Sequence, residues 1–138
     1  MIAILGSKND DSRCSIAVSA LVEKIVESRL NLKIVYESNT AVGRQLSLAC
    51  DAAGISNITG YTSEALIDLN GQVNLRRDIG RVILHPNRKI VHQRILDKVT
   101  SRAFVIWNRN DSELELLLEK MYNKGIKIKE LYLGGKPS

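Results

Sequence analysis

The chain has 138 residues, of which 44% are hydrophobic and 25% are charged. This composition is close to the average of globular proteins, so it excludes a disordered tail and a fibrous repeat. At this length we expect one domain over residues 1–133, followed by a flexible tail at residues 134–138. The apolar runs are far shorter than the roughly 18 residues that cross a bilayer, and we expect a cytoplasmic protein without membrane contact.

The charge balance favours an anionic partner. Twenty Lys and Arg residues against 15 Asp and Glu residues leave a net charge of +5. Proteins that bind nucleic acid usually add a basic stripe with interleaved aromatic residues, and this chain has few aromatic residues. A phosphate-bearing small molecule fits the charge at least as well.

Short apolar runs alternate with helical patterns from the start of the chain. Ile2–Leu5 is a continuous apolar run, which is typical of a strand buried on both faces. N-cap candidates at residues 10–12 precede apolar residues at helical spacing from Ile16 to Val26, which predicts a helix. Leu32–Tyr36 is predicted to be the second strand.

The next segment predicts a second helix and a less regular region. Asn39 or Thr40 can cap the helix, and Gly54 is a natural residue just beyond its last turn. We expect a third short strand near Ser56–Thr59. Asn70-Gly71 lies between two apolar runs and predicts a β-hairpin insertion.

The last third repeats the alternation. Asn87 can cap a helix with apolar residues from Ile90 to Val99, and Ala103–Trp107 is predicted to be a strand. Ser112 and Glu115 have the spacing of a capping box.

A final helix, from Ser112 to Gly125, and a final strand complete the expected order of elements. In Ile126–Tyr132, apolar and charged residues alternate, which suits an edge strand with one solvated face. The whole pattern predicts an α/β fold, a Rossmann-like three-layer sandwich with a mainly parallel sheet and a hairpin insertion.

In such a fold, ligands bind beyond the carboxyl ends of the strands. After the first strand, Gly6 would let the backbone approach a ligand, Ser7 would donate to phosphate and Lys8 would neutralise it. After the second strand, Glu37 would hold a ribose hydroxyl or act as a base, although a surface carboxylate explains it equally well.

Two helix starts add further candidates for the site. Asn39, Thr40 and Gly43 would bind the sugar or a second phosphate. A glycine inside a helix costs up to about 1 kcal/mol relative to alanine, which suggests either close packing or a ligand at Gly43. Arg88 and Lys89 place two cations in a first helical turn, which opposes the helix dipole unless an anion answers them.

The loop after the strand Ala103–Trp107 is polar, and Asn108 and Ser112 are candidate ligand contacts within it. Trp107 could stack on a base, but a strand-end aromatic residue is more often part of the core. Neither a metal nor a cofactor is predicted. His85 and His92 are seven positions apart and lack a third ligand, while the isolated Cys14 and Cys50 are expected to be buried.

Three segments carry a resemblance to a known family. They are IAILGS in the first strand, ESNTAVGRQLSLACDAAG, and HPNRKIVHQRILDKVTSRAFVIWNRNDSELELLLEKM at residues 85–121. In their order and spacing they resemble the SLOG superfamily of Rossmann-like nucleotide-binding domains. That superfamily includes the LOG phosphoribohydrolases and the DprA-like proteins. Where LOG enzymes have a Pro-Gly-Gly-x-Gly-Thr loop, this chain has residues 108–112 without glycine.

The resemblance implies three possible functions. The first is binding of a nucleotide or nucleotide-derived signal without turnover, as a sensor or a sequestering protein, which the missing glycine loop favours. The second is cleavage of an N-glycosidic bond, in which Arg88 would stabilise the leaving side while Glu37 or Glu115 assists the reacting centre. The third is DNA binding of the DprA-like kind. A homodimer is the expected assembly.

Overall fold

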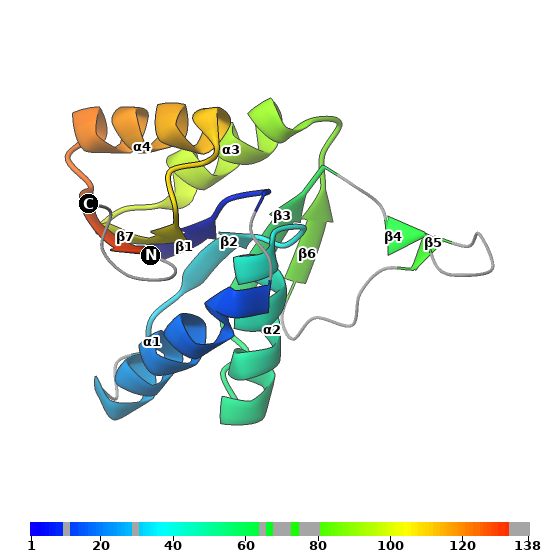
Figure 1. Ribbon diagram of the computed structural model, residues 1–138, viewed down its shortest axis with the longest axis vertical. Coiled ribbons are helices and arrows are strands. Elements are labelled where there is room, and N and C mark those ends of the chain that lie inside the picture. The colour runs from blue at the N-terminus through cyan, green and yellow to red at the C-terminus, as the bar shows by residue number, and fades with distance from the viewer. Residues whose placement is uncertain (10–11, 29–30, 64–65, 68–72, 75–80, 133–138) are drawn as a thin grey trace.

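The computed structural model describes residues 1–9, 12–28, 31–63, 66–67, 73–74 and 81–132. Its main sheet has six strands in the order β6-β3-β2-β1-β7-β8, and every pairing between neighbours is parallel (Figure 1). The strands are β1 (Ile2–Gly6), β2 (Ile34–Glu37), β3 (Ile58–Thr62), β6 (Arg81–Leu84), β7 (Arg102–Trp107) and β8 (Lys127–Tyr132).

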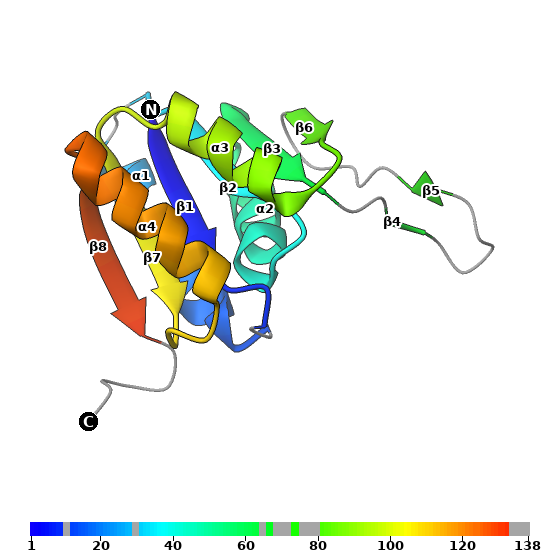
Figure 2. The same cartoon turned by 90° about the horizontal axis from the view of Figure 1, so that it is seen from above.

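Helices cover both faces of this sheet, which makes three layers. The helices are α1 (Ser15–Ser28), α2 (Ala41–Ala53), α3 (Arg88–Lys98) and α4 (Ser112–Lys124), and a short 3-10 helix, η1 (Ser12–Cys14), precedes α1. Figures 1 and 2 show α1 and α2 on one face of the sheet and α3 and α4 on the other. The predicted α/β class and Rossmann-like three-layer arrangement are confirmed.

The alternation of side chains along each strand builds two cores. Ile2 and Ile4 of β1 pack with α1 and α2, whereas Ala3 and Leu5 pack with α3 and α4. All four side chains are buried, as expected for a central strand covered on both faces. Strand β8 lies at the edge of the sheet, as its alternating pattern predicts.

The region between β3 and α3 differs most from expectation. The third strand is Ile58–Thr62, two residues later than its predicted start. The edge strand β6 was not predicted at all. The expected hairpin corresponds to β4 (Leu66–Ile67) and β5 (Val73–Asn74), which pair antiparallel in a separate two-stranded sheet.

Most of the predicted helix ends are confirmed, and two are wrong. Thr40 and Asn87 are the N-caps of α2 and α3. Gly54 and Gly125 end α2 and α4 in the left-handed conformation. The N-cap of α4 is Asp111, not Ser112, because the Asp111 side chain accepts from the Leu114 N–H.

The other wrong helix end is that of α1. Ser12 lies in η1 and does not cap α1, which begins at Ser15. The remaining cap candidates at residues 10–11, the turn at residues 70–71 and the tail at residues 134–138 lie outside the described residues. Cys14 and Cys50 are both buried, as predicted. Within the described part of the chain, no helix has the length and apolar character to span a membrane.

Candidate functional site

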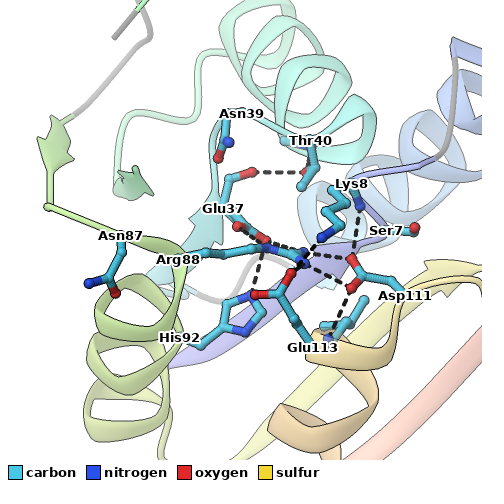
Figure 3. Close-up of polar contacts among 12 residues, drawn as sticks. Ser7, Lys8, Glu37, Asn39, Thr40, Asn87, Arg88, His92, Asp111 and Glu113 are labelled. Carbon is cyan, nitrogen blue, oxygen red and sulfur yellow. Dashed lines mark hydrogen bonds and ion pairs between the residues drawn. The ribbon is translucent and has the colours of Figure 1, made fainter. Parts of the chain in front are cut away.

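The carboxyl ends of β1, β2 and β7 meet the start of α3 at one rim of the sheet. Figure 3 shows the side chains that gather there around the guanidinium of Arg88. Of the predicted residues, Lys8, Glu37 and Arg88 come together in this cluster. Asp111 and Glu113 complete it. We call these five residues the edge cluster.

Arg88 is bound by carboxylates on every side. Its Nε lies 2.7 Å from Oε2 of Glu37 and its Nη2 lies 2.9 Å from Oε1, which makes a bidentate pair. Nη1 lies 2.8 Å from Oδ1 of Asp111, and Nη2 lies 2.7 Å from Oδ2. Nη1 also lies 3.4 Å from Oε1 of Glu113. A guanidinium has five N–H donors, so each of them faces a carboxylate oxygen of the protein itself.

Local structure at the end of β2 fixes the position of Glu37. The Thr40 hydroxyl donates to the Glu37 carbonyl at 2.9 Å and accepts from the Gly43 N–H at 3.0 Å. A Cβ at Gly43 would lie only 2.0 Å from the Glu37 carbonyl oxygen. Close packing of α2 on the end of β2 therefore explains the glycine, which was one of its two proposed reasons.

Asp111 connects three segments of the chain. Its Oδ1 accepts from the Leu114 N–H at 3.2 Å, which caps α4, and its Oδ2 accepts from the Lys8 N–H at 3.0 Å. The same two oxygens contact Arg88. Asp111 is 3% exposed. One buried carboxylate thus ties the loop after β1 to the start of α4 and to α3.

The outer part of the edge cluster is solvated. Lys8 Nζ lies 2.5 Å from Oε1 of Glu113, and both side chains are nearly half exposed. Such surface pairs contribute little to stability. Ser7 is buried, and its hydroxyl accepts from the Asn9 N–H at 3.0 Å. Asn9 Nδ2 donates to the Asn110 carbonyl, which links the two loops a second time.

Electrostatics keep the carboxylates ionised. Burial raises the pKa of Glu37, but hydrogen bonds from His92 and Arg88 outweigh it, and the net pKa is lowered. Burial opposes ionisation of Asp111 too, yet Arg88 and two backbone N–H groups bring its pKa down to about 2. Lys8 lowers the pKa of Glu113, with a smaller contribution from Arg88. Burial lowers the pKa of Arg88, but its bonds to Glu37 and Asp111 reverse this and raise it.

The edge cluster is not the basic patch that the sequence suggested. It holds three carboxylates and two cations, which leaves one net negative charge. The two cations in the first turn of α3 are expected to need an anion. For Arg88, Glu37 and Asp111 supply that charge from within the protein, and a contact between Arg88 and a ligand stays a prediction.

His92 also belongs to the site, although the sequence does not predict it there. It lies four residues after Arg88 on α3 and therefore on the same face of the helix. Its Nε2 lies 3.2 Å from Oε1 of Glu37. In the sequence, His92 is a candidate only as a metal ligand. The spacing from Arg88 was a signal that could have placed both side chains together. Asp111 is not predicted either. Its position three residues before Leu114, the spacing of an N-cap and the N–H that it binds, is a signal that identifies it.

The other predicted residues lie around the cluster. Gly6 faces Val42, whose Cγ2 would lie 2.2 Å from an added Cβ, so packing accounts for this glycine. Trp107 is 2% exposed and belongs to the core beneath α3 and α4. Four others are exposed: Lys89, Asn108, Ser112 and Glu115.

Two polar atoms near this rim are buried without a partner among the described residues. They are Oδ1 of Asn39, in the loop after β2, and Nε2 of His85, just after β6. The His85 ring stacks on Tyr61, with centroids 5.6 Å apart. Buried polar atoms are nearly always hydrogen-bonded, so these two are candidate contacts for a bound molecule. Nε1 of Trp107 is also unpartnered, but it belongs to the core.

The described residues contain no group of three or more His, Cys, Asp or Glu side chains arranged to hold a metal ion. No model of a known protein family matches the chain. A search of curated proteins also gives no match.

Proposed function

We propose that this protein binds a nucleotide or nucleotide-derived molecule at the carboxyl rim of its parallel sheet and does not turn it over. The observation that supports binding over catalysis is the state of the acidic residues. Glu37, Asp111 and Glu113 all have lowered pKa values and all contact Arg88. A general acid or base works best with a pKa near the working pH, and none of these three groups meets that condition.

Groups suited to a ligand remain around the edge cluster. Lys89 is exposed at the start of α3 and can attract a phosphate. The unpartnered Oδ1 of Asn39 can accept a hydrogen bond from a sugar hydroxyl, and the His85 ring offers an unpartnered nitrogen. Every donor of Arg88 faces a carboxylate, so in this proposal Arg88 holds the end of β2 and the start of α4 in place, and its neighbours contact the ligand.

The alternative, an N-glycosidic hydrolase like the LOG enzymes, receives less support. It would need Glu37 or Glu115 to assist the reacting centre. Glu37 is 1% exposed and bonded to both Arg88 and His92, and Glu115 is exposed on α4.

Membership of the SLOG superfamily remains a proposal that rests on the motifs at residues 2–7, 37–54 and 85–121.

A ligand panel tests the proposal. The protein is incubated with nucleoside monophosphates, cyclic nucleotides and ADP-ribose derivatives, while thermal shift and base release are followed. We expect a shift without base release. Lys89→Ala should reduce the shift from phosphorylated ligands, whereas Lys98→Ala, at the far end of the same helix, should not. A shift accompanied by base release would favour the hydrolase instead.

DNA binding and self-association are decided by separate measurements. If no small molecule shifts the melting temperature and DNA is retained with a steep dependence on salt, the DprA-like function replaces this proposal.

We also propose a homodimer, because small domains often complete a pocket across a two-fold axis. Sedimentation velocity measures the mass in solution, and a monomer at all concentrations would refute the dimer.

A further inference from the structure

A groove between α3 and α4 opens at the same rim as the edge cluster. The two helices lie side by side on one face of the sheet (Figure 2). Each contributes residues at positions i, i+3, i+4 and i+7, which form one face of a helix. These residues are Lys89, His92, Gln93 and Leu96 from α3, and Glu113, Leu116, Leu117 and Lys120 from α4. The groove has a volume of about 690 Å³ and is also lined by Asn87 and Ile90.

His92 lines this groove and uses one ring nitrogen, Nε2, in its contact with Glu37. Its side chain is 9% exposed, and its Nε2 contacts Oε1 of Glu37 at 3.2 Å. A carboxylate only accepts hydrogen bonds, so Nε2 of His92 is the donor to Glu37; in the tautomer that carries its one hydrogen on Nε2, Nδ1 is an acceptor. Among the described residues, Nδ1 has no partner. Since His92 lines the groove, a ligand there can donate to Nδ1.

The remaining lining suits a flat, mostly apolar group attached to an anion. Leu116 is 53% exposed although it is a large apolar residue. Leu96 and Leu117 continue the apolar surface. At the mouth, Lys89 stands next to the rim and supplies a positive charge for an anion. Binding pockets for small molecules commonly combine such an apolar lining with a few polar groups that fix orientation.

We propose that the α3–α4 groove is the base subsite of the nucleotide site. The heterocycle lies against Leu96, Leu116 and Leu117, and one of its N–H groups donates to Nδ1 of His92. The phosphate remains at the mouth of the groove beside Lys89. This inference rests on the proposed function, and it adds which part of the ligand each element recognises.

The test compares whole nucleotides with their parts. Binding of AMP, GMP, CMP and UMP is measured by calorimetry beside ribose 5-phosphate, which lacks a base. Leu116→Asp places a charge in the groove at an exposed position, so the fold is kept. Tyr122→Asp is the matched control, because Tyr122 is 73% exposed on the same helix and does not line the groove. We expect Leu116→Asp to weaken the best nucleotide about tenfold or more, with ribose 5-phosphate unchanged.

A second readout reports on His92 itself. The chain has two histidines, so ¹⁵N spectra of the imidazole rings are simple to assign. We expect the Nδ1 resonance of His92 to shift when the nucleotide binds and not when ribose 5-phosphate binds. Lys89→Ala should weaken the nucleotide more than the matching nucleoside.

The outcomes separate the two proposals. If the wild-type protein binds no nucleotide, the proposed function fails and the base subsite falls with it. If the wild-type protein binds a nucleotide but Leu116→Asp behaves like Tyr122→Asp, only the base subsite is overturned. It is overturned as well if Leu116→Asp changes the oligomeric state and leaves nucleotide affinity unchanged, because the groove would then be a contact between protein chains.

Discussion

Replacing Arg88 with methionine tests the role of the edge cluster in stability. The substitution keeps an unbranched apolar side chain and removes the charge. Glu37 loses both contacts to the guanidinium and keeps His92. Asp111 loses Arg88 and keeps the backbone N–H groups of Lys8 and Leu114. Two carboxylates that are at most 3% exposed are then left without a cation in contact.

The size of the effect follows from this partial loss of partners. Breaking a buried ion pair by removing one partner typically costs about 3–5 kcal/mol. Because both carboxylates keep other hydrogen bonds, we expect the lower end, about 3 kcal/mol of unfolding free energy. For a domain of this size that corresponds to a fall in melting temperature of about 10 °C. The exposed Arg94 on the same helix provides the control, and Arg94→Met should change stability by less than about 0.5 kcal/mol.

Urea unfolding at a series of pH values measures both the size and the cause. The fluorescence of the single, buried Trp107 reports the transition. Arg88 helps to lower the folded-state pKa of Glu37 and of Asp111, the latter to about 2. Their contribution is therefore complete above the unfolded pKa values near 4 and is lost as pH falls towards 2.

The difference in stability between wild type and Arg88→Met should shrink over the same range, from pH 5 towards pH 2. A difference that stays constant between pH 7 and pH 3 would refute this reasoning, because lost packing of the Arg88 stem would then explain the whole effect.

Three further predictions follow from local contacts. Gly43→Ala would stabilise an ordinary helix, but here it should destabilise the protein by about 1–3 kcal/mol, because the added Cβ would meet the Glu37 carbonyl oxygen. Urea unfolding measures this change in stability, and a gain in stability would contradict the packing argument. Thr40→Ala removes the N-cap of α2 and should cost about 1 kcal/mol in the same assay, while an unchanged midpoint would show that the cap is dispensable. Cys50 is buried, and burial raises its thiol pKa to about 11. A thiol reagent at pH 8 should therefore label Cys50 only in denaturant. Mass spectrometry of the Cys50 peptide measures the labelling, and rapid labelling of the native protein would contradict the burial.

Most of the predictions that rest on short-range sequence patterns are confirmed. Continuous apolar runs predict β1 and β7. The residues at helix ends correctly predict Asn87, Gly54 and Gly125, and Thr40 is one of the two candidates for the cap of α2. The missed strand β6 is only four residues long and lies in a region without clear periodicity. Ser112 and Glu115 have the spacing of a capping box one residue later, and this pattern obscures Asp111 as the N-cap of α4.

The sequence by itself determined the α/β class, most helix boundaries and the set of polar loops that face one rim. Only the tertiary structure decided which charges pair. Arg88 binds a carboxylate 51 residues before it and another 23 residues after it. The strand order brings β2 and β7 to either side of β1, and no local pattern encodes that order. Side-chain pairing therefore places Arg88, which the sequence predicts to bind an anionic ligand, at the centre of carboxylates from the protein itself.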